Sequence, residues 1–343
     1  MDKETFLKRI QGFVEGVPLI VLGSGATVPY GLPTMSQLAE QLETEINFNS
    51  DDRDNYEVWN EFKNKLQKTG DLETALQETR VTEAILKRVI KCTWNFVNEA
   101  DKKAFDKIIS NPQEFHLINL LKHFGTSQRE LRVITTNYDR LAEYASSYTN
   151  GFAYTGFTNN YVGNHIAEAA DQKYKQLDHY GYLIKIWKIH GSLDWFKNGE
   201  GVVRSFPHSQ YIADNHSPCI ITPGAEKYRE SLQDPFRSIL TQIDKDFSNA
   251  SSFLCIGYGF NDEHVHPKLL SKAKNDNIPV VLATKEISKA AKREILNSDI
   301  QKYALIEDNG KNGTRVFLSD HEEEIVYDNE DFWSVSGLMS ILK

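Results

Sequence analysis

The stretch Pro18-Leu19-Ile20-Val21-Leu22-Gly23-Ser24-Gly25-Ala26-Thr27 decides the fold class of this chain. Its unbroken apolar run predicts a strand that is buried on both faces, as in a parallel sheet covered by helices. The glycines predict a tight turn directly after the strand. Thr34 or Ser36 then provides an N-cap for a helix that continues to Ile46.

Similar apolar runs recur along the chain, and helical periodicity lies between them. The further predicted strands are 131–136, 183–189, 218–222, 252–257 and 278–283. The predicted helices around them are 4–16, 139–144 and 234–247. Strands that alternate with helices predict an α/β fold, a Rossmann-like and mainly parallel sheet flanked by helices. Ligands of such sheets bind at the carboxyl ends of the strands.

Three regions depart from this alternation, although we expect 1–343 to form a single domain. Residues 47–130 are charged and helical in period, with separate helices expected from Phe105 and over 115–124, which predicts a helical insertion into the sheet domain. Residues 146–181 are rich in Tyr, Asn, Gly and Thr, and we expect a lid or small subdomain there. Residues 303–343 predict short strands and an acidic surface tail.

The bulk composition limits the classes of function. The chain has 343 residues, a net charge of -9 and 40% hydrophobic residues, which suits a folded domain and argues against a direct nucleic-acid binder. The three cysteines, Cys92, Cys219 and Cys255, form no C-x-x-C pair, so no zinc module is expected. The polar N-terminus and the short apolar runs predict a cytoplasmic protein without a membrane segment.

The glycine turn is the first candidate for ligand chemistry. A helix that starts after Gly23-Ser24-Gly25 would present backbone N–H groups and a positive dipole end to a pyrophosphate. Val28 stands where a G-x-G-x-x-G pattern would have its third glycine. A strand-to-helix turn that needs glycine for its backbone conformation is therefore an equal alternative.

Polar side chains follow two further predicted strands. Asn137 could hold a ribose hydroxyl or orient a water, and Asp139 could support the loop; alternatively, both side chains cap the next helix. His190 could act as a general base near neutral pH, although a single histidine is more often a packing residue. His264 and His266 alternate as a metal pair would, but Pro267 argues for a passage from loop to helix, and we predict no metal site.

Taken together, these phrases resemble the sirtuin (silent information regulator) superfamily. Gly23-Ser24-Gly25-Ala26-Thr27-Val28-Pro29-Tyr30-Gly31-Leu32-Pro33 resembles its G-A-G-x-S-x-x-x-G-I-P loop, and Thr135-Thr136-Asn137-Tyr138-Asp139 its T-Q-N-x-D. His190-Gly191 resembles the catalytic His-Gly, and Gly257-Tyr258-Gly259 the late glycine loop.

The departures from the deacylase pattern point to one branch of that superfamily. Thr34-Met35-Ser36 stands in place of Asp-Phe-Arg, Thr136 in place of Gln, and the four-cysteine zinc module is missing. The phrases resemble the bacterial anti-phage defence branch, which hydrolyses NAD+. That resemblance implies abortive infection, a homo-oligomer, and a HerA-type ring ATPase or a phage-derived activator as partner.

The sequence therefore predicts an NAD+ glycohydrolase that uses NAD+ as substrate and no metal. The predicted catalytic residues are Asn137, which orients water and ribose, and His190, the base. The predicted NAD+-binding residues are Gly23, Ser24, Gly25, Ala26, Thr27, Pro33, Asp139, Gly257, Tyr258, Gly259 and Asp262. The alternatives are an NAD- or ADP-ribose-binding regulatory subunit without turnover and an NAD-dependent protein deacylase.

Overall fold

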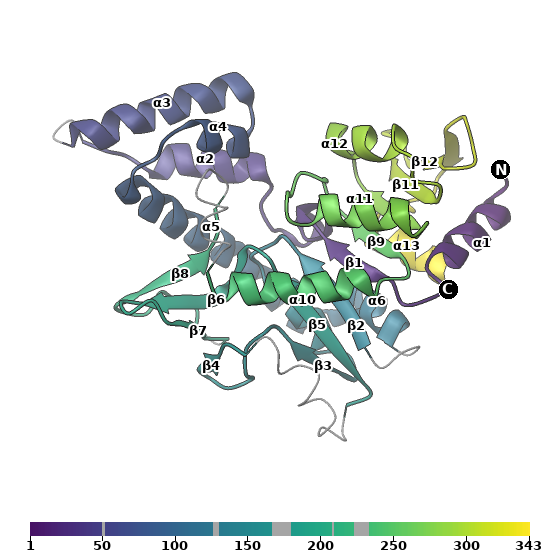
Figure 1. Ribbon diagram of the computed structural model, residues 1–343, viewed down its shortest axis with the longest axis horizontal. Helices are drawn as coiled ribbons and strands as arrows, with labels where there is room; N and C mark the ends of the chain where they lie inside the picture. The colour runs from purple at the N-terminus through teal and green to yellow at the C-terminus, as the bar shows by residue number, and fades with distance from the viewer. Residues whose placement is uncertain (50–51, 126–129, 167–179, 208, 223–232) are drawn as a thin grey trace.

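The computed structural model describes residues 1–49, 52–125, 130–166, 180–207, 209–222 and 233–343 (Figure 1). Its centre is a nine-stranded sheet in the order β13-β12-β11-β10-β9-β1-β2-β5-β3. All neighbouring strands from β11 to β3 run parallel, and β12 and β13 are added antiparallel. The predicted α/β class with a mainly parallel sheet is confirmed.

The strands of this sheet are short and mostly buried. They are β1 (Leu19–Leu22), β2 (Glu130–Thr135), β3 (Gly151–Tyr154), β5 (Tyr182–Lys188), β9 (Phe253–Ile256), β10 (Val280–Thr284), β11 (Tyr303–Asp308), β12 (Gly313–Leu318) and β13 (Ile325–Asp328). The central strand β1 has β2 on one side and β9 on the other. The chain therefore reverses its direction of travel across the sheet at β1, which is the switch point where ligands bind in open α/β sheets.

Helices cover both faces of the sheet, which explains the unbroken apolar run of β1. Its Ile20 and Leu22 belong to one hydrophobic cluster, and its Leu19 and Val21 belong to the other. The first cluster includes residues of α1 (Lys3–Phe13), α6 (His116–Gly125), α7 (Leu141–Ser146) and α13 (Val335–Leu342). The second includes residues of α10 (Phe236–Ser248), α11 (His266–Asn275), α12 (Lys289–Ala291) and the π-turn η6 (Lys292–Leu296).

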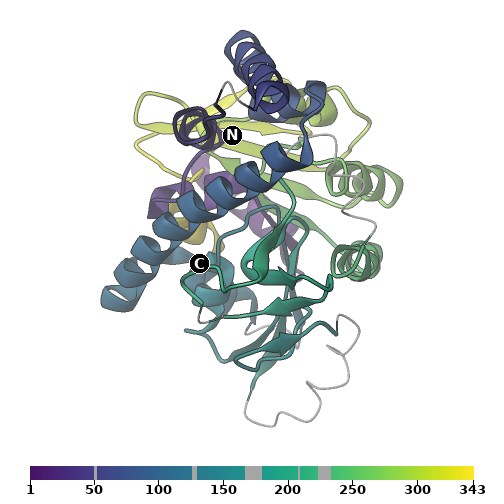
Figure 2. The same cartoon turned by 90° about the vertical axis from the view of Figure 1, so that its left-hand side faces the viewer.

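A layer of helices lies at one end of the molecule and has its own hydrophobic cluster (Figures 1 and 2). It consists of α2 (Met35–Glu45), α3 (Arg53–Thr69), α4 (Leu72–Glu78) and the N-terminal half of α5 (Glu83–Ser110). We call it the helical layer. Thr34 caps α2 with a reciprocal bond to Gln37, as its position before the helix predicts. The chain is helical from Phe105 as expected, although this stretch is the end of α5, which continues unbroken through that residue; η3 (Pro112–Glu114) then joins α5 to α6.

A second, antiparallel sheet includes the strand that follows His190, and the predicted strand 218–222 corresponds to its strand 216–220. Its order is β4 (Gly163–Asn164), β7 (Val203–Ser205), β6 (Gly191–Asn198) and β8 (His216–Ile220). Asp194 lies in the buried middle of β6, where it accepts hydrogen bonds from Ser192 and Ser205. Residues 167–179 of the expected 146–181 subdomain lie outside the described residues, as do residues 223–232, which follow the expected strand 218–222.

The C-terminal end of the chain is a buried helix that the sequence did not predict. The acidic stretch Glu322–Glu324, around which a surface tail was expected, is exposed. Beyond them α13 places Leu338 and Ile341 in the core, and Gln11 of α1 donates a hydrogen bond to the carbonyl of Ile341 at 2.7 Å. Within the described ranges, none of the helices is both long and apolar enough to cross a bilayer.

Candidate functional site

The register of four adjacent strands brings the sequence phrases into one row. Leu22 of β1 pairs with Thr135 of β2 and with Ile256 of β9, and Thr135 pairs with Lys188 of β5. The residues that follow these positions therefore leave the sheet at the same level and on the same edge. Gly23, Thr136 and Gly257 come first in the row, and His190 follows two residues after Lys188.

The two glycine loops pack directly against each other. The Gly25 N–H donates to the carbonyl of Gly257 at 3.1 Å, and a Cβ on Gly25 would lie 2.7 Å from the Gly257 Cα. A Cβ on Gly23 would lie 2.3 Å from the Gly257 oxygen, and Gly257 itself has φ +57°. These glycines are thus needed for the contact between the loops, whether or not a phosphate also approaches them.

The α-helix expected after the glycine turn begins at Met35 with Thr34 as its N-cap, which is one of the two predicted caps. Two 3-10 turns, η1 (Ser24–Ala26) and η2 (Val28–Tyr30), lie between the glycines and this helix. The N–H groups of Ala26 and Thr27 donate to the carbonyls of Gly23 and Ser24. Of the four N–H groups of residues 24–27, all of them described, that of Ser24 makes no main-chain hydrogen bond.

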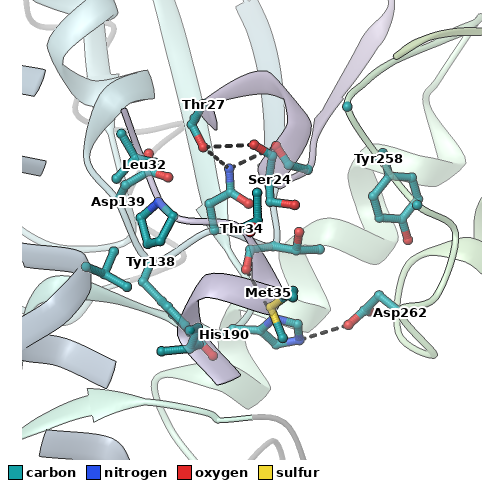
Figure 3. A pocket seen from close by; sticks show the side chains of 18 of the residues that line it. Ser24, Thr27, Leu32, Thr34, Met35, Tyr138, Asp139, His190, Tyr258 and Asp262 are labelled. Atoms are coloured by element: carbon teal, nitrogen blue, oxygen red, sulfur yellow. Dashed lines mark hydrogen bonds and ion pairs between the residues drawn. The ribbon is translucent and has the colours of Figure 1, made fainter. Parts of the chain in front are cut away.

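A pocket lies at this edge of the sheet, and most of the predicted site residues line it (Figure 3). The predicted residues in its wall are Gly23, Ser24, Thr27, Pro33, Asn137, Asp139, His190, Gly257, Tyr258, Gly259 and Asp262. Gly25 and Ala26 are not among the described lining residues: Gly25 is exposed, and Ala26 is fully buried. Asn137 and His190, which are separated by 53 positions in the sequence, thus face one cavity.

Asn137 is fixed by the glycine loop. Its Nδ2 donates to the carbonyl of Gly23 at 3.0 Å and to Thr27 Oγ1 at 3.3 Å. Because a main-chain carbonyl only accepts, the amide NH₂ must lie on this side of the side chain. The Oδ1 atom is then the part of Asn137 that is available to accept a hydrogen bond from a ligand or a water.

His190 is held between two loops. Its Nδ1 lies 3.2 Å from the carbonyl of Thr136, and its Nε2 lies 2.8 Å from Asp262 Oδ2. The Thr136 carbonyl and the Asp262 carboxylate both only accept hydrogen bonds, so each ring nitrogen can donate to its neighbour only when it carries a proton. Nε2 is buried, and its contact with Asp262 is short but at an angle outside hydrogen-bond geometry. The two contacts fix the orientation of the imidazole ring in the pocket.

Asp139 is buried and lines the same pocket as His190. Its Oδ1 accepts the N–H of Leu141 at 3.1 Å, which is the local capping role expected as one alternative. Burial raises the pKa of Asp139 to about 6, against the opposing effect of Lys188. Lys188 is itself fully buried, donates to the Asp139 carbonyl, and lies 3.1 Å from Glu143 Oε1.

The charges that line the pocket are mainly acidic. Glu73, Asp139 and Asp262 line it together with His190, and neither lysine nor arginine is among its described lining residues. Tyr258 adds a hydroxyl whose pKa is raised well above its ordinary value by burial. Such a lining favours a ligand that carries or develops positive charge near these carboxylates.

The helical layer contributes a part of the wall that the sequence patterns did not reveal. Thr34 at the N-cap of α2, Met35 and Leu38 of α2, and Glu73 of α4 line the pocket. Val97 of α5, which belongs to the first cluster of the sheet core, also lines it. Thr34 was predicted as a helix cap, but no local pattern indicates that the first turn of α2 faces the strand ends. Glu73 lies on a short helix whose position depends wholly on tertiary packing.

The two histidines tested as a metal pair have other surroundings. His266 Nδ1 lies 2.6 Å from the carbonyl of Asp262, at the first residue of α11. Across the ranges that the structure describes, no group of three or more His, Cys, Asp or Glu side chains has the arrangement of a metal site.

Comparisons with known proteins give a family for part of the chain. Residues 131–300, just under half of the chain, match the SIR2-like domain family. The match includes Asn137, His190 and the loop 257–262, and the first glycine loop precedes it. No curated protein matches the sequence.

Solved structures with a related arrangement are Sir2 proteins. A Sir2 homologue in complex with NAD shares 13% identity with a TM-score of 0.45, over 89% of this chain and 88% of its own. Sir2Tm bound to a propionylated peptide shares 15% identity with a TM-score of 0.41, over 88% of this chain and 92% of its own.

Proposed function

We propose that this protein is an NAD+ glycohydrolase, which converts NAD+ and water into nicotinamide, ADP-ribose and a proton. The observation that carries the proposal is the convergence of Asn137 and His190 on one acid-lined pocket at the switch point of a parallel sheet. The SIR2-like match over 131–300 supports it.

Hydrolysis of NAD+ places three requirements on the pocket. The bond between ribose C1′ and the nicotinamide nitrogen breaks, and its electron pair neutralises the pyridinium, so the leaving group needs no acid. The sugar passes through an oxocarbenium-like state that carries positive charge. A water oxygen then bonds to C1′, and its proton must be taken up by a base.

The residues of the pocket fit these requirements. Asn137 Oδ1 would orient the ribose or the water, because Nδ2 is held by Gly23 and Thr27. His190 would take the proton from a ribose hydroxyl or from the water, and later release it to solvent. Asp139 and Asp262 would stabilise the positive charge on the sugar.

The pyrophosphate would lie between the first glycine loop and α2. The N–H of Ser24 and the first turn of α2, which starts at Met35 and lines the pocket, offer donors and a positive dipole end. Gly23, Thr27 and Pro33 would form the floor around it, with Gly25 and Ala26 as support behind. Tyr258 and Gly259 would contact the adenosine end.

The test follows nicotinamide and ADP-ribose by chromatography after NAD+ is added to the full chain, with and without an acylated lysine peptide. We expect equal amounts of both products without peptide. Release that depends on the peptide, together with an O-acylated ADP-ribose, would instead assign a protein deacylase. Saturable NAD+ binding without nicotinamide release, at every oligomeric state of the chain, would assign a regulatory subunit.

We further propose that the activity depletes NAD+ during anti-phage defence and is held inactive until triggered. An uncontrolled hydrolase would harm the cell that makes it, so a homo-oligomer, a HerA-type ring ATPase or a phage-derived activator is expected as control. Resemblance to the defence branch supports this part. The test is co-expression with a HerA-type ATPase during phage challenge, where His190→Ala should abolish both NAD+ loss and protection.

A further inference from the structure

The loop after β9 places a carboxylate against the predicted catalytic base. Asp262 is buried, and its Oδ2 lies 2.8 Å from His190 Nε2 (Figure 3). We infer that Asp262 is the positioning residue of His190, which orients the ring and stabilises its protonated form. This inference rests on the proposed hydrolase function.

Asp262 is well anchored for such a role. Its Oδ1 accepts the N–H of His264 at 2.9 Å and that of Val265 at 3.1 Å, and its carbonyl accepts the N–H of His266 at 3.1 Å. These bonds tie the carboxylate to the start of α11. N–H donors favour the charged form of a carboxylate, so Oδ2 presents a fixed negative charge to the ring.

The opposite edge of the ring is fixed too. Nδ1 lies 3.2 Å from the Thr136 carbonyl just after β2, so the ring bridges the loops after β2 and β9. Both oxygens that face the ring only accept, so the neutral ring, with one N–H, can donate to one of them at most. The protonated ring can donate to both, and its contact with Asp262 is then an ion pair. Asp262 thus favours the state that His190 reaches when it acts as base.

The neighbouring ionisable groups cannot replace Asp262. Asp139 is engaged by the Leu141 N–H, and Glu73 and Tyr258 line other parts of the same wall. Within the described residues, Asp262 is the carboxylate that forms an ion pair with His190.

Two variants separate the role in helix capping from the role toward His190. In Asp262→Asn an amide oxygen can still accept from His264 and Val265, and in Asp262→Ser a hydroxyl can still cap the turn. Both lose the charge at His190. Glu263→Gln, at the exposed next position, removes the same charge and serves as control.

Steady-state turnover of NAD+ is measured for these variants alone and combined with His190→Ala. We expect kcat to fall between about 10-fold and 10²-fold in both Asp262 variants, with KM within about twofold. This loss is smaller than the full rate factor of a positioned base, because His190 itself is retained. Glu263→Gln should match the unmodified protein. In the His190→Ala background, Asp262→Asn should cause no further loss.

The inference is overturned if both Asp262 variants keep full kcat, or if Asp262→Asn lowers turnover equally with and without His190. If the unmodified protein binds NAD+ but releases no nicotinamide, the proposed function fails. The unmodified protein, Asp262→Asn, His190→Ala and the double variant are then unfolded in urea instead. Additive changes in unfolding free energy then overturn the pairing, and non-additive changes support it.

Discussion

The carboxyl edge of the parallel sheet and the helical layer build the same pocket by different means. At the sheet edge, strand register and loop packing fix Asn137 and His190 relative to each other, and the glycines are required by contacts between main-chain atoms. The helical layer has a hydrophobic cluster of its own and reaches the pocket through residues such as Thr34 and Glu73. We infer that the sheet edge determines the chemistry and that the layer determines the fit around the ligand.

The largest expected effect is on turnover and belongs to the sheet edge. His190→Ala and Asn137→Ala should each lower kcat for nicotinamide release by roughly 10²–10⁴-fold, because each removes a group placed at the reacting sugar. Circular dichroism and the urea midpoint should stay close to those of the unmodified protein. His321→Ala, at an exposed position, is the control. Full turnover in both pocket variants would remove the sheet edge from the chemistry.

The second prediction breaks the helical layer while sparing the sheet. Trp59 is 2% exposed and stacks on Phe62 within the cluster of the layer. Trp59→Ala should lower the stability of the layer by about 3–5 kcal/mol. Hydrogen exchange should then rise over α3 and α4 but not over β1 and β2, and NAD+ should bind more weakly. Equal loss of protection in both regions would show that they unfold as one unit.

The third prediction concerns the contact between the glycine loops. Gly257 has φ +57°, and a Cβ there would lie 2.2 Å from the Ala26 nitrogen. Gly257→Ala should therefore lower the free energy of unfolding by roughly 2–4 kcal/mol through backbone strain and overpacking. Gly310→Ala is the matched control, because Gly310 also has positive φ but no atom within 4 Å of the added Cβ. Urea unfolding should show about 1 kcal/mol for that control. Similar losses in both variants would mean that the loops do not need close packing.

How much of this the sequence could predict differs between the two regions. The strand ends follow from apolar runs and glycines, so the row formed by Gly23, Asn137 and His190 could be expected from parallel pairing alone. The position of Glu73 depends on how α3 and α4 pack, which no local period encodes. The pairing of Asp262 with His190 depends on the course of the loop after β9, and the buried α13 was missed because its apolar run follows an acidic stretch.

The smallest effect is on the pH dependence of stability. The pKa of Asp139 is raised by burial to about 6 in the folded protein, above its ordinary value of about 3.9. The folded state thus holds this proton more tightly than the unfolded state does. The contribution of Asp139 to stability is greatest below about pH 4 and is lost as the pH rises through about 6, by about 3 kcal/mol. Urea unfolding of Asp139→Asn between pH 4 and 7.5 should lack this loss; parallel curves for the two proteins would contradict the buried state of Asp139.

The most direct measurement of the central claim is a crystal structure of His190→Ala with NAD+ bound. The account predicts the nicotinamide ribose beside Asn137 Oδ1 and the cavity left at position 190, with the pyrophosphate between Ser24 and the first turn of α2. NAD+ bound elsewhere on the molecule, or a ribose turned away from Asn137, would contradict it.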